Sequence, residues 1–150
     1  MKLQPIATVK NSQIEAIDDH WESNVAEIEL ADHIPTEAFK NISNFSHLKI
    51  IYYFGKVKTE NIVFSGRPRE NLNSPLVGIF GQRKKDWPNQ IVLCTAVLLE
   101  HDERLLKVKY LDAINRKPIL EIEPAFKEFQ PRGEINRPVC VVDLMKNYWK

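Results

Sequence analysis

The feature that most constrains this fold is the long apolar run QIVLCTAVLLE at residues 90–100. A continuous apolar segment of this length, rich in β-branched residues, predicts a central strand that is buried on both faces. The charged turn RKKDWPN at residues 83–89 stands directly before it. Core packing accounts for the strand and gives no reason for such a turn. The turn is therefore a candidate functional segment.

Other segments show either strict alternation of apolar and polar residues or enrichment in β-branched and aromatic residues, as short strands do. The sequence IPTEAFKNI at residues 34–42 predicts one short helix, with Pro35 in its first turn and Ile34, Ala38 and Ile42 facing inward. About seven strands with one helix predict a mainly β fold, a small closed or nearly closed β-barrel. The other six predicted strands are LQPIATV (3–9), VAEIEL (25–30), HLKIIYYF (47–54), PLVGIF (75–80), RLLKVKYL (104–111) and PILEIEP (118–124).

The organisation along the chain predicts one barrel domain and a tail. We find no internal repeat or linker before Pro131, so residues 1–131 are expected to form the barrel. Residues 132–150 follow as a tail whose apolar run VCVVDLM is expected to pack on the barrel or on a second subunit.

Composition excludes several classes of protein. No apolar stretch approaches the length of a membrane span, and the N-terminus lacks the apolar region of a secretory signal, so we expect a cytoplasmic protein with no membrane partner. The two cysteines are then most simply buried thiols. Glycine-rich nucleotide motifs and a G-x-S-x-G elbow are absent, and the four histidines are scattered. These absences argue against a Rossmann site, a P-loop, a hydrolase and a metal centre.

Charge is unevenly distributed although the net charge is only +1. Residues 11–37 contain eight acids and no Lys or Arg, whereas residues 67–85 contain five bases and a single acid. Such polarity can orient an anionic ligand toward one face. The alternative is a solvated surface with uneven charge.

Four separated segments occur in an order typical of a known family: NFSHLKIIYYF, RPREN, VGIFGQRKKDWPNQI and YLDAINRKPILEIEP. In this order they resemble the TsaA-like (UPF0066, YaeB) domain family, whose members include TrmO-type tRNA methyltransferases. The resemblance spans roughly residues 3–131. The matching residues are Phe45, Ser46, His47, Arg67, Pro68, Arg69, Gly78, Phe80, Arg83, Pro88, Asn89, Ile91, Leu111, Asp112, Pro118, Ile119, Leu120, Ile122 and Pro124.

The resemblance implies a β-barrel methyltransferase that binds S-adenosylmethionine, as a homodimer with the cofactor near the subunit interface. In TrmO-like members the acceptor is the exocyclic nitrogen of threonylcarbamoyl-adenosine beside the tRNA anticodon. A related small acceptor is the alternative here. Under this resemblance the turn at residues 83–89 corresponds to the cofactor-binding motif of the family.

The chain also departs from the family pattern. Trp87, Gln90 and Val92 replace an arginine, a proline and a glycine of the family motif. A valine in place of glycine adds a side chain that would block close approach of a ligand to the backbone. These departures leave open a second hypothesis, a non-catalytic TsaA-like barrel that binds a nucleotide-like ligand or a protein partner.

Cofactor binding is expected for residues of two loops. Arg83 is expected to pair with the methionyl carboxylate, because a guanidinium binds a carboxylate through two parallel hydrogen bonds. Arg67 and Arg69 alternate in what reads as an extended segment, so both are expected to face one way, toward a ligand anion or simply toward solvent. Trp87 would stack on adenine or act as a packing plug, and Asn89 would bond a ligand or its own turn. The full expected set is Arg67, Arg69, Phe80, Gln82, Arg83, Trp87, Pro88 and Asn89.

Two residues are candidates for a catalytic role. His47 at a strand start could act as an acid or base near neutral pH, or be structural. Asp112 after KYL could orient the acceptor amine, or cap the following turn.

Overall fold

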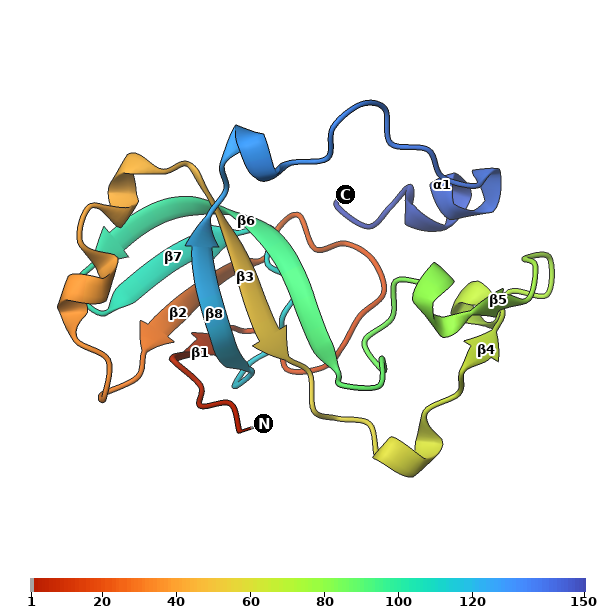
Figure 1. Cartoon of the computed structure of the whole chain (residues 1–150), viewed down its shortest axis with the longest axis horizontal. Coiled ribbons are helices and arrows are strands. Elements are labelled where there is room, and N and C mark those ends of the chain that lie inside the picture. The colour runs from red at the N-terminus through yellow and green to blue at the C-terminus, as the bar shows by residue number, and fades with distance from the viewer. Residues whose placement is uncertain (1) are drawn as a thin grey trace.

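A closed antiparallel barrel of six strands forms the centre of the computed structural model, which describes residues 2–150 (Figure 1). Neighbouring strands follow the order β1-β2-β7-β6-β3-β8 around the barrel. The predicted mainly β, closed-barrel fold is therefore confirmed, with six barrel strands against the seven strands expected. The strands are β1 (Ala7–Lys10), β2 (Val25–Leu30), β3 (His47–Tyr53), β6 (Ile91–Asp102), β7 (Leu105–Lys109) and β8 (Pro118–Pro124).

Alternation explains why these segments close into a barrel. In β3 every second residue is buried, and Ile50 and Tyr52 lie inside the barrel opposite Cys94 and Val92 of β6. Burying one such aliphatic side chain contributes about 1.5–3 kcal/mol to stability. Because a strand repeats every two residues, a slip of one residue would turn the whole inward set out to solvent.

The prediction that the run at residues 90–100 is buried on both faces is wrong. Val92, Cys94 and Ala96 point into the core, whereas the side chains between them face outward. Leu93 is 48% exposed and Leu99 is 49% exposed. The strand belongs to a single-walled barrel, so only one of its faces meets the core.

The helix predicted at residues 34–42 is replaced by two short 3-10 turns, η1 (Thr36–Phe39) and η2 (Ile42–Asn44). Asn41 adopts a left-handed conformation between them, with φ of 62°, which interrupts the helix. Phe39 is the buried residue in place of the expected Ala38. Ile34 and Ile42 do pack against the core.

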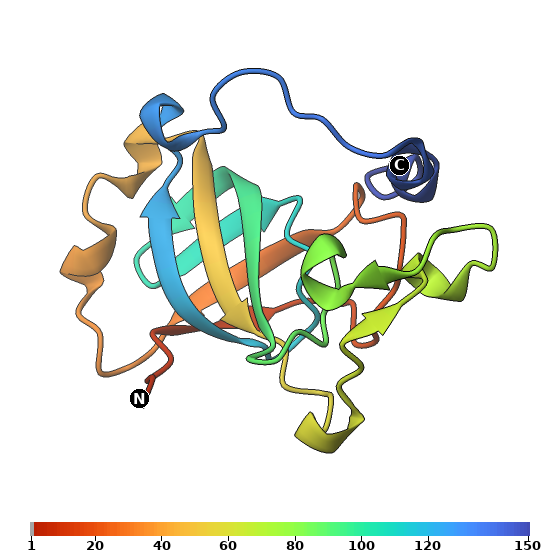
Figure 2. The same cartoon turned by 45° about the vertical axis from the view of Figure 1, so that its right-hand side comes forward.

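Residues 54–90, called the arm below, leave the barrel between β3 and β6 and project from its side (Figure 2). The arm contains a two-stranded sheet, β4 (Ser65–Gly66) with β5 (Val77–Gly78), and the turns η3 (Thr59–Asn61), η4 (Pro68–Glu70) and η5 (Ile79–Gly81). The strand expected at residues 75–80 is thus reduced to two residues. The chain bends into η5 directly after β5, as the Ile79 amide donates to the carbonyl of Phe64.

Beyond η6 (Lys127–Phe129), the tail of residues 132–150 crosses to the side of the barrel where the arm lies (Figures 1 and 2). Its helix α1 (Val139–Met145) contains no buried residue. The tail is held at its end, where the amides of His20 and Trp21 donate to the carbonyls of Asn147 and Tyr148. None of the helices in residues 2–150 has the length and apolar character that crossing a membrane requires.

Candidate functional site

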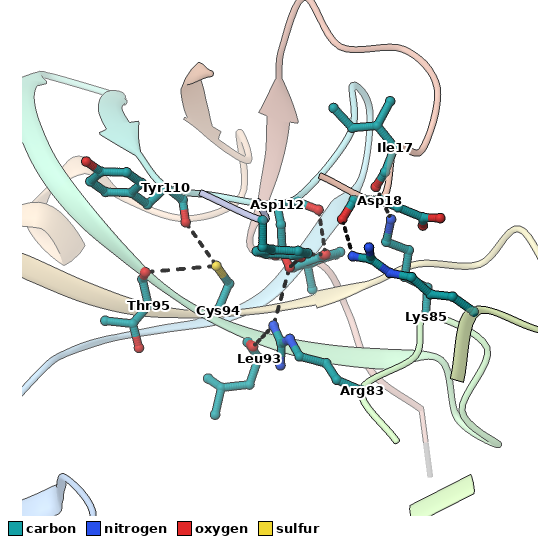
Figure 3. Close-up of polar contacts among 12 residues, drawn as sticks. Ile17, Asp18, Arg83, Lys85, Leu93, Cys94, Thr95, Tyr110 and Asp112 are labelled. Carbon is teal, nitrogen blue, oxygen red and sulfur yellow. Dashed lines mark hydrogen bonds and ion pairs between the residues drawn. The ribbon is translucent and has the colours of Figure 1, made fainter. Parts of the chain in front are cut away.

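Arg83 and Asp112 form an ion pair at the end of the barrel that faces the arm (Figure 3). The Arg83 Nη2 atom donates to the Asp112 carboxylate over 3.3 Å and to the Leu93 carbonyl over 3.1 Å. The Asp112 side chain is 3% exposed, whereas that of Arg83 is 46% exposed. Burial is the largest single influence and lowers the pKa of the guanidinium, but the charge of Asp112 and the other contacts around Arg83 together raise this pKa above its ordinary value.

Two tyrosine hydroxyls complete the surroundings of the Asp112 carboxylate. Tyr148 donates to its Oδ2 atom over 2.5 Å, and Tyr52 lies 3.2 Å from Oδ1 while also donating to the Asp112 backbone carbonyl over 2.9 Å. Burial, reinforced by the carboxylate charge, raises the pKa of both phenols. Both hydroxyls are therefore protonated donors at neutral pH, as a buried carboxylate requires.

Cys94 lies beside this cluster and does not supply a nucleophile. Its Sγ atom donates to the Tyr110 carbonyl over 3.1 Å (Figure 3). Burial, followed by the negative charge of Asp112, raises the pKa of the thiol. Since only the thiolate is reactive, Cys94 is a structural residue of the barrel end.

The basic arm contacts the acidic segment of residues 11–24, called the acidic loop below. Arg69 forms an ion pair with Asp19 at 2.9 Å and donates to the Asp18 carbonyl over 2.7 Å. Lys85 donates to the Ile17 carbonyl over 2.9 Å and lies 5.7 Å from the ring centre of Trp21. Part of the uneven charge seen in the sequence is therefore neutralised inside the molecule.

Arg67 and Arg69 do not face one way, so that prediction is wrong. Arg67 donates to the Ser74 carbonyl within the arm, whereas Arg69 reaches the acidic loop. Arg69 adopts a left-handed conformation, with φ of 50°, inside η4. The alternation assumed for an extended segment fails because the backbone turns at this residue.

Two other expected cofactor residues, Gln82 and Trp87, serve the internal structure of the arm. The Gln82 amide donates to the carbonyls of Val77 and Gly66, and the Trp87 indole donates to those of Ile79 and Gln82. These contacts agree with Trp87 as a packing plug.

The remaining members of the expected set lie at the surface. Phe80 is 84% exposed, and Pro88 and Asn89 form the half-buried and exposed turn into β6.

Gln90, expected only as a departure from the family motif, also joins the arm to the barrel. Gln90 is 4% exposed. Its Oε1 atom accepts a hydrogen bond from the Val57 amide, and its Nε2 atom donates to the Val57 carbonyl. Its φ of 51° is inaccessible to proline, whose ring fixes φ near −65°. The turn therefore differs in backbone conformation from a family motif with proline here. Val92, in contrast, points into the core and blocks nothing at the surface.

His47 lies apart from this cluster. It is exposed on the outer face of β3, opposite Val97, and its Nδ1 atom is 2.8 Å from the Ser46 hydroxyl. The Arg83 pair instead lies by Leu93, which is opposite Ile51 near the other end of the strand. The structure therefore brings together Arg83 and Asp112, and leaves His47 on the surface.

Comparison with known proteins identifies relatives of this fold and sequence. The family model described as tRNA-methyltransferase O N-terminal domain matches residues 12–130. A probable S-adenosyl-L-methionine-binding protein of Pyrococcus abyssi is 28% identical over 100 residues, which cover 67% of this chain and 52% of the relative. The human tRNA (adenine(37)-N6)-methyltransferase is 26% identical over 113 residues, covering 75% of this chain and 25% of that protein.

The crystal structure of TrmO from Pseudomonas aeruginosa superimposes with a TM-score of 0.74 at 16% identity, over 93% of this chain and 61% of that one. The shared fold is thereby shown. This chain spans about half the length of the Pyrococcus relative and a quarter of the human enzyme.

Proposed function

This chain belongs to the family of tRNA-methyltransferase O N-terminal domains, and from that premise we propose that it binds S-adenosylmethionine and methylates a modified adenosine in tRNA or a related small acceptor. The observation that carries the proposal is that Arg83 has unused hydrogen-bond donors. Within residues 2–150, only the Nη2 atom of this guanidinium makes hydrogen bonds, which leaves Nε and Nη1 for a ligand.

These donors fit the amino-acid part of the proposed cofactor. Nε carries one N–H and Nη1 carries two, so a ligand carboxylate can accept charge-assisted hydrogen bonds from them. Because Arg83 is about half exposed, a ligand can reach it from solvent. The ion pair with Asp112 would hold the guanidinium in place, and the negative charge of Asp112 helps to keep Arg83 protonated.

When bound, S-adenosylmethionine supplies an electrophilic methyl group, so the protein mainly has to hold donor and acceptor in line and exclude water. Asp112 is poorly placed to accept a proton from the acceptor. Its Oδ2 atom already accepts from Arg83 and Tyr148, and its Oδ1 atom lies beside Tyr52. We therefore propose that Asp112 orients Arg83, and that the acceptor loses its proton to solvent or to a group on a second subunit.

Calorimetric titration with S-adenosylhomocysteine and S-adenosylmethionine tests the proposal. Wild-type protein should bind saturably, and Arg83→Ala should weaken binding about 10- to 100-fold, as expected for loss of a charge-assisted pair. Arg137→Ala in the exposed part of the tail is the matched control and should leave binding unchanged. No binding of either ligand at millimolar concentration would contradict the proposal.

The acceptor is tested separately, by transfer of a labelled methyl group to bulk tRNA. The family name and the human relative support an adenosine in tRNA as the acceptor. Transfer that depends on Arg83 and is absent with tRNA lacking modified adenosines would support the finer statement. Binding of cofactor without transfer to tRNA would instead favour a small acceptor.

The backbone change at Gln90 and the internal use of Gln82 and Trp87 favour one alternative, a barrel that binds a nucleotide-like ligand or a protein without catalysis. The calorimetric titration distinguishes this alternative from the methyltransferase proposal. Binding of S-adenosylhomocysteine and of adenosine with equal affinity, unaffected by Arg83→Ala, would favour this alternative.

We also propose that the chain forms a homodimer through the arm. Apolar side chains crowd the arm surface although nothing within residues 2–150 covers them. Sedimentation velocity should show a dimer that Phe80→Ser weakens, and a monomer at all concentrations would contradict this. The exposed residues are Val63, Phe64, Leu72, Leu76 and Phe80.

A further inference from the structure

The tail brings one buried side chain to the Arg83 site from outside the matched family domain. The family model ends at residue 130, and Tyr148 lies well beyond that point. Tyr148 is 8% exposed, whereas α1 before it contains no buried residue. The tail therefore reaches the barrel mainly through its last residues, and the buried one among them contacts Asp112.

We propose that Tyr148 is a positioning residue of the Arg83 site, which acts by holding the Asp112 carboxylate against the guanidinium. This inference deepens the proposed function and rests on it for the identity of the ligand. No hydrogen bond joins the side chains of Tyr148 and Arg83 within the described residues. Its effect passes through the Oδ2 atom of Asp112, which accepts from both side chains.

The division of the Asp112 oxygens explains how this would work. On one side, the Tyr52 hydroxyl of the barrel wall lies 3.2 Å from Oδ1 and 2.9 Å from the Asp112 backbone carbonyl. On the other side, Tyr148 supplies the shorter contact, 2.5 Å against 3.3 Å for the Arg83 Nη2 atom. With Tyr148 in place, one donor of Arg83 suffices for Asp112. Without it, the buried Oδ2 atom would keep only the longer Arg83 contact and would draw a second N–H of Arg83 toward itself.

That rearrangement would take a donor away from the ligand. Arg83 carries five N–H donors in a rigid fork, and a fork–fork contact with Asp112 would pair Nη2 with either Nε or Nη1. One of the two nitrogen atoms left for a ligand carboxylate would then be occupied. Tyr148 would thus preserve a one-donor contact that leaves both atoms open.

The geometry argues against the tail acting as a plug of the same site. With the tail in place, the Arg83 side chain is still 46% exposed. The tail is also anchored independently of the Tyr148 hydroxyl, because the amides of His20 and Trp21 bond to its backbone and the His20 ring lies 2.9 Å from the Lys150 carbonyl. Removing the hydroxyl alone should therefore leave the tail docked. A plug predicts tighter binding after its removal, and a positioning residue predicts weaker binding.

The test compares wild-type protein with Tyr148→Phe, which keeps the ring and removes only the hydroxyl. Tyr53→Phe, at a 41% exposed tyrosine on the outer barrel surface, is the matched control. Calorimetry with S-adenosylhomocysteine should show binding about fivefold weaker or more for Tyr148→Phe and unchanged for the control. A second measurement needs no ligand. Nitrogen-15 spectra of the Arg83 side chain report how the guanidinium is held, and Tyr148→Phe should shift its Nε and Nη signals.

Each outcome decides the inference. Weaker binding together with shifted Arg83 signals supports it, and unchanged or tighter binding by Tyr148→Phe overturns it while leaving the cofactor proposal intact. If wild-type protein binds no S-adenosylhomocysteine, the proposed function fails and the spectra decide alone. Shifted Arg83 signals would then support a positioning role toward another anion, and unshifted signals would overturn it. Thermal denaturation distinguishes these results from simple unfolding of the variant.

Discussion

The barrel and the arm are organised on different physical principles. In the barrel, an uninterrupted alternation places Leu48, Ile50 and Tyr52 at 0% exposure, and the hydrogen bonds run between strand backbones. In the arm, strands are two residues long, and individual side chains such as Gln82 and Gln90 bond the backbone. The barrel is therefore stabilised mainly by buried apolar contacts. The arm depends more on individual polar contacts between side chains and the backbone.

The two regions also differ in backbone conformation and in the exposure of apolar side chains. Arg69, Glu70 and Gln90 all have positive φ within or at the edge of the arm. Leu72 is 83% exposed there, whereas inward leucines such as Leu48 in the barrel are at 0%. Arg83, the residue that we expect to bind ligand, comes just where the arm returns to the barrel. Arg83 therefore lies on a loop that the barrel positions, and binding residues often occur on such loops.

The largest effect should come from the barrel core. Ile50→Ala should lower the free energy of unfolding by about 2–5 kcal/mol, because it removes buried methyl groups and leaves a cavity. Leu72→Ala in the arm removes a side chain of the same size from an exposed position and should change stability by less than about 0.5 kcal/mol. Urea denaturation of both variants measures the contrast. Equal losses would show that the arm is packed in solution as tightly as the barrel.

A smaller loss of stability should follow from a substitution at Gln90, where the arm joins the barrel. Gln90→Leu should cost about 1–3 kcal/mol, because the amide and carbonyl of the half-buried Val57 lose their partners. Gln130→Leu, at an exposed glutamine that donates to the Phe126 carbonyl, is the matched control and should cost little. Urea denaturation again gives the free energies. If the two variants were equally stable, Val57 would have found water as a partner.

The smallest effect should come from the link between the arm and the acidic loop. The hydrogen bond from Arg69 holds the pKa of the Asp19 carboxyl below its usual value of 3.8. The stabilisation is therefore present above the unfolded-state pKa and is lost as pH falls through the folded-state pKa. Asp19→Asn should cost about 0.3–1 kcal/mol at pH 7, and the difference from wild type should vanish once the pH lies below the folded-state pKa of Asp19. A difference that persists in acid would assign the effect to packing.

Alternation in the sequence was sufficient to predict the barrel. The segments VAEIEL and PILEIEP were predicted as strands with the bounds that β2 and β8 have in the structure. The predictions failed where the backbone leaves regular periods. Asn41 interrupts the helix expected at residues 34–42, and Arg69 breaks the extended segment that would have aligned it with Arg67. A single left-handed residue reverses the direction of a side chain, and residue type only weakly indicates where it occurs.

The sequence by itself determined the closed β-barrel, the family, and the pair of Arg83 and Asp112 as site candidates, because periodicity and motif order are properties of the chain. Only the tertiary structure decided what surrounds that pair. Tyr52 is 60 residues from Asp112 and Tyr148 is 36 residues from it, and no local pattern links them. A buried carboxylate must be satisfied by donors near it in space, and closure of the barrel and return of the tail select which residues those are.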